Sequence, residues 1–261
     1  MSLHVERDGA VLRLTLDGPR RNALDDASVA ALIGELEGAG QDDGVRVVTL
    51  SGSGDDFCSG FDIVARNQGG GERPRVGSIQ RRLPAQAHRL IPLVLEVQVP
   101  VVCVVRGWAA GIGFQLALAA DFTIAAGDAR FWQPFVTRGF TPDSGAAWLL
   151  PRMVGLARAR ELLILGRELR GTEAEGWGLI HRAVDGADLD REAAALVAQL
   201  ASSATVAVGL TKRLLNTGVS LDLHAHLANE AFALELSSRS QDFKEGLVAF
   251  TEKRPPEYGG R

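Results

Sequence analysis

The first half of the chain alternates short apolar runs, which predict strands, with segments whose apolar residues recur at helical spacing. Glycine, proline and acidic residues bound the short runs, as is usual for strands. Strands that alternate with helices favour an α/β fold. The predicted elements are a β-hairpin (3–7 and 11–16), a helix (27–38), a buried strand (45–50), a helical segment broken or kinked by its prolines (79–97), a buried strand (99–105), a helix (114–120) and two short strands (122–125 and 129–132).

The second half of the chain is predominantly helical. A turn at 141–145 leads into a helix, and the pair Thr172 and Glu175 predicts a capping box at the start of a later one. Beyond these, helical spacing predicts helices over 156–165, 189–201, 204–216, 221–238 and 241–253. The change to helix alone places a subdomain boundary near residue 190. Residues 66–78, with three consecutive glycines and a proline, are expected to form a mobile loop.

Two glycine-rich turns each follow a predicted buried strand. One runs from Gly107 to Gly113, and the other is Phe57-Cys-Ser-Gly-Phe61. The first N–H groups of a helix lack intrahelical partners and lie at the positive end of the helix dipole, so they can bind an oxygen that gains negative charge. If the two turns face one another, one N–H from each forms an oxyanion hole. The alternative is a pair of tight turns in which glycine serves packing alone.

Composition and charge exclude several classes of protein. The 261 residues carry a net charge of −4, which argues against a general nucleic-acid binder. The glycine spacing matches neither the dinucleotide-binding fingerprint nor the phosphate loop. The two cysteines, Cys58 and Cys103, have small or apolar neighbours and favour a reducing compartment. No apolar run approaches roughly eighteen residues and the N-terminus lacks a signal-peptide pattern, so we expect a cytoplasmic protein without a membrane partner.

Several motifs carry a resemblance to a known family. The segments 57–63 and 106–121, supported by those at 19–24, 141–145, 174–180 and 242–254, resemble the enoyl-CoA hydratase/isomerase (crotonase) family. The resemblance implies an α/β fold built as a crotonase-like spiral of ββα units over 1–190, which holds the acyl-CoA site. It also implies that residues 191–261 form a helical oligomerisation region, which assembles a homotrimer or a dimer of trimers.

The resemblance also implies the layout of the site. A coenzyme A thioester, which is the substrate and not a permanently bound cofactor, would place its carbonyl between the N–H groups of Phe61 and Ile112. The turns at 20–24 and 59–63 would line the pantetheine and nucleotide path, while two residues of the last helix reach the adenine end, often from a neighbouring subunit. The residues implied to contact coenzyme A are Arg21, Ala23, Leu24, Ser59, Gly60, Asp62, Ile63, Gly111, Phe250 and Lys253.

The sequence departs from the family at two positions that matter for catalysis. Hydratases of the family carry a glutamate in the central helix and a second one after the Gln-Pro of the next strand, and these act as paired acid and base. Here Gln115 and Phe135 stand at those positions, and neither side chain exchanges protons near neutral pH. Water addition by the two-carboxylate mechanism is therefore not expected.

Asp143 is the remaining candidate for acid–base chemistry. Its Pro-Asp-Ser-Gly turn resembles that of isomerase-like and some dehalogenase-like members, in which the aspartate lies over the acyl chain. As a base it would move a proton between the α and γ carbons, and apolar neighbours such as Phe135, Phe140 and Trp148 would raise its pKa by desolvation. The alternative is that Asp143 only caps the following helix.

We therefore expect an acyl-CoA enzyme, with double-bond isomerisation favoured. The alternatives are a hydratase-type or hydrolytic reaction, or a non-catalytic acyl-CoA binding protein. The aromatic residues Phe61, Trp108, Phe135 and Trp148 suggest a bulky or ring-containing acyl group, although a long chain would also fit. No metal site is expected, because the histidines lack metal-ligand spacing and are expected at the surface; these are His4, His88, His181, His224 and His226.

Overall fold

Six strands form the main sheet of the computed structural model, which describes residues 3–63 and 75–261. Their order is β1-β2-β3-β4-β6-β9, and only β1 and β2 pair antiparallel, as the hairpin pattern predicted. The strands are β1 (Leu3–Asp8), β2 (Val11–Leu16), β3 (Val47–Gly52), β4 (Val101–Val105), β6 (Phe122–Ala126) and β9 (Arg182–Val184).

A second, smaller sheet lies beside the first, and its strands have the order β5-β7-β8. β5 (Trp108–Ala110) pairs parallel with β7 (Arg130–Trp132), which pairs antiparallel with β8 (Leu169–Arg170). The sequence predicted β7 but not β5, β8 or β9. β5, β8 and β9 have two or three residues each, too few to show alternation of apolar and polar positions. Pairing with a neighbouring strand fixes them in the extended conformation.

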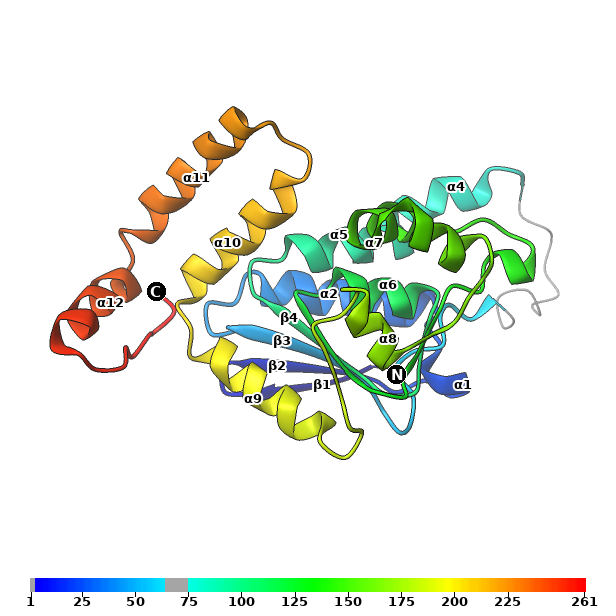
Figure 1. Ribbon diagram of the computed structural model, residues 1–261, viewed down its shortest axis with the longest axis horizontal. Helices are drawn as coiled ribbons and strands as arrows, with labels where there is room; N and C mark the ends of the chain where they lie inside the picture. The colour runs from blue at the N-terminus through cyan, green and yellow to red at the C-terminus, as the bar shows by residue number, and fades with distance from the viewer. Residues whose placement is uncertain (1–2, 64–74) are drawn as a thin grey trace.

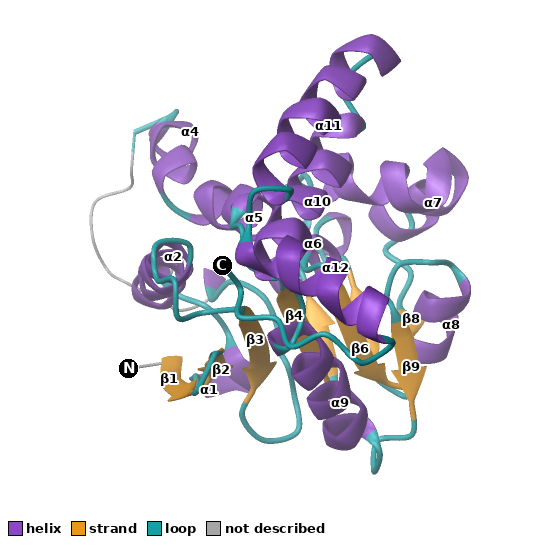
Figure 2. Cartoon of the chain, turned by 90° about the vertical axis from the view of Figure 1, so that its left-hand side faces the viewer, coloured by secondary structure: helices purple, strands orange, loops and turns teal. Residues whose placement is uncertain are grey.

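Helices cover both faces of the main sheet (Figures 1 and 2). α2 (Asp26–Ala39), α5 (Ala87–Glu96) and α6 (Ile112–Ala119) lie over one face, and α9 (Leu189–Ala201) packs on the other. Side chains of one strand therefore serve two cores: in β3, Val48 and Leu50 face the larger core, whereas Val47 packs with Val197 of α9. This burial of both faces explains why the parallel strands are apolar throughout.

Shorter helices connect these layers. α1 (Pro19–Asn22) precedes α2, and α4 (Ser78–Arg82) and the 3₁₀ turn η1 (Leu83–Ala85) precede α5. Pro84 thus breaks the helix as predicted, whereas Pro92 lies within α5. The predicted loop at 66–78 lies largely outside the described residues.

The segment after the second sheet contains η2 (Val136–Arg138), α7 (Ala146–Leu163) and α8 (Gly171–Gly176). The two helices predicted around residue 150 form one element, α7, which bends at Gly155 with a φ of 72°. The predicted capping box is wrong, because the N-cap of α8 is Arg170 and no side chain caps it. Thr172 is the second residue of α8, so its hydroxyl does not occupy the N-cap position.

The four predicted C-terminal helices are confirmed within a few residues: α9, α10 (Thr205–Gly218), α11 (Leu223–Ser237) and α12 (Gln241–Glu252). α10 to α12 extend away from the sheets, at the left of Figure 1. No single helix among the described residues is long and apolar enough to cross a membrane, whereas α9 and α10 taken together, bent by 106°, have that length and composition.

A buried ion pair joins α10 to the sheet layer. Lys212 Nζ lies 2.7 Å from Asp121 Oδ2 and donates to the carbonyl oxygens of Val94 and Val99 at 2.8 and 3.3 Å. The same carboxylate oxygen accepts the N–H of Val101 at 2.7 Å. Burial raises the pKa of Asp121 and lowers that of Lys212, and their mutual attraction opposes both shifts. The pair therefore fixes α10 against the core.

Candidate active site

The two glycine-rich turns lie face to face. Cys58 donates its N–H to the carbonyl of Trp108 at 2.8 Å and accepts the N–H of Ala110 at 2.9 Å. A Cβ on Gly111, which has a φ of 52°, would lie 3.8 Å from the Cα of Gly60. That distance is ordinary van der Waals contact, whereas a Cβ on Gly60 would lie only 3.1 Å from the carbonyl oxygen of Ala110. The positive φ of both glycines, 106° at Gly60, suits no other residue well.

The start of α6 adds a backbone donor to this junction. α6 begins at Ile112, so the N–H of Ile112 has no acceptor within the helix. A Cβ on Gly113 would lie 2.6 Å from the carbonyl oxygen of Cys58, which shows how tightly the helix start packs on the other turn. Phe61, the other expected donor, forms a parallel bridge with Leu24 beside Gly60. The two N–H groups expected to form the oxyanion hole thus lie in adjoining turns.

The turn expected to line the coenzyme A path has a left-handed backbone. Arg20, Arg21 and Asn22 have φ values of 53°, 62° and 58°, which is rare for residues other than glycine. The buried Asn22 side chain holds the turn by donating to the carbonyls of Ser53 and Asp56 at 3.0 and 2.7 Å. Such strained turns persist only where their surroundings fix them, and they concentrate at functional sites.

This turn runs alongside the segment 59–63. Leu24 donates its N–H to Gly60 and accepts that of Asp62, both at 2.8 Å, and Ser59 donates to the carbonyl of Arg21 at 2.9 Å. A charge-assisted bond between Arg20 and Asp62 closes the contact. The structure therefore brings together eight of the ten residues implied to contact coenzyme A: Arg21, Ala23, Leu24, Ser59, Gly60, Asp62, Ile63 and Gly111.

The other two implied contacts lie elsewhere in the subunit. α12, which carries Phe250, is at the opposite side of the molecule from α1 (Figure 1). Phe250 is 84% exposed, and Lys253 forms the left-handed C-cap of the helix. Neither residue reaches the glycine turns of its own chain.

The positions that carry glutamates in hydratases are buried and neutral. The Gln115 amide donates to the carbonyl of Asp143 at 3.3 Å and to Oε1 of Gln133 at 3.4 Å. Phe135 is buried and packs edge-on against Phe140, with ring centroids 5.4 Å apart. Neither Gln115 nor Phe135 can hold a water-activating charge, which agrees with the expectation from the sequence.

Asp143 is a half-buried carboxylate in a strained turn. Burial raises its pKa, and a hydrogen bond from Ser144 and the charge of His88 oppose that shift. Ser144 has a φ of 49° and Gly145 one of 85°, so two left-handed residues separate Asp143 from α7. The N-cap of α7 is Gly145 without any side-chain cap, and Ala146 donates to the main-chain carbonyl of Asp143 at 3.1 Å. The alternative role of Asp143 as a helix cap is therefore wrong.

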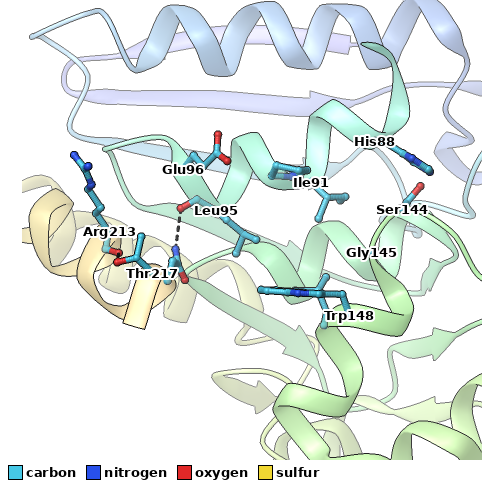
Figure 3. A pocket seen from close by; sticks show the side chains of 12 residues that line it. His88, Ile91, Leu95, Glu96, Ser144, Gly145, Trp148, Arg213 and Thr217 are labelled. Carbon is cyan, nitrogen blue, oxygen red and sulfur yellow. Dashed lines mark hydrogen bonds between the residues drawn. The ribbon is translucent and has the colours of Figure 1, made fainter. Parts of the chain in front are cut away.

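A cavity of about 710 Å³ opens next to this turn (Figure 3). α5 supplies one wall, the start of α7 a second, and α10 the far end. The lining is mostly apolar, with Trp148 along one side and charged groups away from Ser144. The residues that line it are His88, Ile91, Pro92, Leu95, Glu96, Ser144, Gly145, Trp148, Leu149, Arg213, Asn216 and Thr217.

The lining corrects two expectations from the sequence. His88, expected at the surface, is half-buried and faces the cavity, on the same face of α5 as Ile91 and Leu95. That i, i+3, i+7 spacing was the signal in the sequence that could have placed it there. Of the four aromatic residues expected to face the acyl group, Trp148 lines the cavity, whereas Phe61, Phe135 and Trp108 are not among its lining residues. Trp108 lies in the second sheet, near the guanidinium groups of Arg21 and Arg130, which are 5.8 and 5.1 Å from its ring.

Neither cysteine nor metal chemistry is indicated in the part of the chain that the structure describes. Cys58 and Cys103 are unpaired and buried, and burial raises the pKa of the Cys58 thiol to about 12. Within residues 3–63 and 75–261 no cluster of three or more His, Cys, Asp or Glu side chains is arranged to hold a metal ion. The ionisable side chains at the Ser144 end of the cavity, among the described residues, are those of Asp143 and His88.

Known proteins resemble the chain over its whole length. Residues 6–261 match the family model for enoyl-CoA hydratase/isomerase. The chain is 39% identical to a 1,2-epoxyphenylacetyl-CoA isomerase of Escherichia coli K12, with 99% of this chain and 97% of that protein covered. It is 34% identical to a carnitinyl-CoA dehydratase of the same organism, with 100% and 99% covered. The crystal structure of an enoyl-CoA hydratase from Bacillus anthracis superposes with a TM-score of 0.91 at 31% identity, and both chains are fully covered.

Proposed function

Because the chain belongs to the enoyl-CoA hydratase/isomerase family, we propose that it shifts a double bond within the acyl group of a coenzyme A thioester, with Asp143 as the base. The crotonase-type α/β fold with C-terminal helices, expected from the sequence, is confirmed, and the protein is an acyl-CoA enzyme of this family. The placement of Asp143 carries the proposal. It is a half-buried carboxylate with a raised pKa beside a cavity, while both glutamate positions are neutral.

The proposed reaction moves one proton and one double bond. Asp143 removes a proton from the α or γ carbon of the enoyl thioester, and the electron pair of that C–H bond passes into a dienolate. The N–H groups of Phe61 and Ile112 stabilise the negative charge on the thioester oxygen. Protonation at the other end of the dienolate completes the shift and restores the carboxylate. A base with a raised pKa suits both steps, because it binds the abstracted proton more strongly than an ordinary aspartate does and can still release it to carbon.

The cavity bears on the choice of substrate. Its volume and the wall formed by Trp148 and Leu149 can hold a ring-bearing or long acyl chain. The E. coli relative is named for a phenylacetyl thioester, which fits a ring in this position. We propose that coenzyme A enters as part of the substrate along the turns at 20–24 and 59–63, and that no cofactor is permanently bound. The two buried, unpaired cysteines favour a cytoplasmic enzyme.

We also propose that the enzyme assembles as a homotrimer or a dimer of trimers through residues 191–261. Helices α10 to α12 expose large apolar side chains that a soluble monomer rarely leaves in water, among them Leu215, Leu223, Phe232, Leu234, Leu247 and Phe250. A neighbouring chain could then bring Phe250 and Lys253 to the adenine end of the site. Analytical ultracentrifugation tests this: a mass of three or six chains is expected, and a monomer at micromolar concentration contradicts it.

The reaction is tested by incubating the protein in D₂O with a panel of α,β- and β,γ-enoyl-CoA thioesters with linear and ring-bearing acyl groups. We expect NMR to show deuterium at the α or γ carbon together with a moved double bond. Asp143→Asn should lower turnover by about 10²–10⁴-fold, the usual contribution of a general base, while thioester binding survives. Asp43→Asn, at an exposed aspartate, is the matched control and should leave turnover unchanged.

The other outcomes identify the competing functions. Addition of water without a double-bond shift would indicate hydratase-type chemistry, and release of free coenzyme A would indicate hydrolysis. Saturable binding without exchange on any thioester would indicate a non-catalytic binding protein. Isomerisation that persists unchanged in Asp143→Asn would remove Asp143 from the mechanism.

A further inference from the structure

We propose that His88 is a second proton-transfer residue of this site, which takes the proton from Asp143 and delivers it to the far end of the dienolate. This inference rests on the proposed isomerisation and adds a step to it. The C–H bond breaks as the O–H bond of Asp143 forms, that proton then passes to an imidazole nitrogen of His88, and the imidazolium protonates the other carbon. Asp143 and His88 both end in their starting states, and no oxidant or reductant is needed.

The position of His88 is the first observation that supports this role. His88 lies in the first turn of α5 and lines the same end of the cavity as Ser144 and Gly145. Figure 3 shows its ring directed toward the side chain of Ser144, the residue that follows Asp143 in the turn. The imidazole therefore lies at the same end of the cavity as the turn that carries the proposed base.

The hydrogen bonding of His88 is the second observation. Its Nε2 atom is buried and has no hydrogen-bond partner among the described residues. A buried polar atom without a partner costs free energy, so proteins usually provide one. The Ser144 hydroxyl does not fill this role, because it bonds to the Asp143 carboxylate. Nε2 is thus left available to accept or donate a proton.

The charges around the cavity single out this pair. The charge of His88 acts on Asp143, which places the two groups within electrostatic reach. The other charged residues that line the cavity, Glu96 and Arg213, lie at its opposite end (Figure 3). Glu96 is already paired with Arg89, at 3.4 Å. Among the described lining residues, His88 is therefore the titratable group at the Asp143 end.

A two-group mechanism differs from a one-base mechanism in the fate of the proton. A carboxylic acid alone returns much of the hydrogen that it removed and exchanges only the rest with water, so a large share of an isotope moves within the substrate. A proton that passes through an imidazolium is exposed to exchange with water, so the product carries solvent hydrogen. Label retention therefore reports the pathway of the proton and does not depend on how much of the enzyme is folded.

The experiment uses an enoyl-CoA thioester that the wild type isomerises, deuterated at the carbon that loses its proton, in ordinary water with enzyme in excess. We expect wild-type product to contain mainly solvent hydrogen. His88→Gln should retain a clearly larger fraction of deuterium and lower kcat by about 10²-fold, as the loss of a proton-transfer group does. His88→Asn serves as a second variant, and His4→Gln, at an exposed histidine of β1, is the matched control.

Each outcome tests one of the two proposals. Equal deuterium retention in wild type and both His88 variants would overturn the role of His88 and leave it as part of the cavity wall. Failure of the wild type to isomerise any thioester, or full activity of Asp143→Asn, would instead contradict the proposed function. Increased retention in the His88 variants, with the His4→Gln product unchanged, supports the relay.

Discussion

Two aspartates in this protein lie in buried surroundings that raise the pKa, and they differ in what compensates their charge. Asp121 forms an ion pair with Lys212 at 2.7 Å and accepts the N–H of Val101 at the same distance. Their side chains are only 16% and 5% exposed, so the pair is a closed structural unit. Every strong interaction of Asp121 that the structure shows ties one element of the fold to another.

Asp143 lacks such compensation. Its carboxylate receives a hydrogen bond from Ser144 and the electrostatic influence of His88, and it adjoins a cavity of about 710 Å³. A carboxylate left partly uncompensated costs folding free energy, and the same property lets it exchange a proton with a ligand. The comparison teaches that burial alone does not identify a catalytic acid or base. A catalytic carboxylate is identified instead by the lack of a compensating cation and by an adjacent cavity.

The largest effect is expected from breaking the compensated pair. Lys212→Met removes the cation and leaves Asp121 buried and unpaired, which typically costs about 3–5 kcal/mol. Urea denaturation should show this loss in the free energy of unfolding, while kcat of the folded fraction stays close to wild type.

The double variant Lys212→Met with Asp121→Asn is the control for this prediction. Because the uncompensated charge is gone, it should recover a large part of the lost stability. If the double variant is as unstable as the single one, the charge of Asp121 is not what the pair compensates.

A somewhat smaller effect, this time on turnover, is expected at the junction of the glycine turns. Gly113→Ala places a Cβ 2.6 Å from the carbonyl of Cys58, so the start of α6 must move away from the facing turn. Displacing one oxyanion donor costs about 10²–10³-fold in kcat. Gly34→Ala is the matched control: nothing lies within 4 Å of its Cβ in the exposed part of α2, and it should raise stability by up to about 1 kcal/mol. Wild-type kcat for Gly113→Ala would contradict a shared oxyanion site.

The smallest expected effect concerns the pH dependence of activity. Asp143 must be ionised to accept a proton, and burial raises its pKa, so kcat/KM should fall on acidification at a higher pH than for an ordinary aspartate. Ser144→Ala removes the hydrogen bond that opposes this shift, so the acidic limb should move to still higher pH. A pH–rate profile that is identical in Ser144→Ala would show that Ser144 does not stabilise the ionised form.

Hydrophobic periodicity and turn residues in the sequence predicted the elements whose formation depends on neighbouring residues. The hairpin before Leu16, the four helices after Leu189 and the glycine turns around Gly60 and Gly111 were all foreseen, because each has a clear period or a turn residue. The neutral positions Gln115 and Phe135 were also read directly from the sequence.

The remaining features depend on contacts between distant segments. β5, β8 and β9 exist through pairing, and Lys212 meets Asp121 across 91 residues of sequence. His88 was expected at the surface, because the helical spacing that it shares with Ile91 and Leu95 indicates a common face of α5 but not the cavity that α7 and α10 form beside that face. Only the three-dimensional arrangement distinguishes the carboxylate beside the cavity from the one in the ion pair.

The most direct test of this account compares Asp143→Asn and Asp121→Asn side by side, with kcat on an isomerised thioester and urea denaturation at pH 7 as the two readouts. A carboxylate whose pKa is raised on folding stabilises the folded state when it is protonated, and this stabilisation is lost as the pH rises through that pKa. At pH 7 the ionised Asp143 therefore contributes no such stabilisation. Replacing it with neutral Asn should not lower the free energy of unfolding. Asp143→Asn is expected to lose turnover and keep its stability. Asp121→Asn, which leaves Lys212 buried and unpaired, is expected to lose stability and keep the turnover of its folded fraction. Full turnover in Asp143→Asn, or equal loss of turnover in both folded variants, would contradict the assignment of Asp143 as the base.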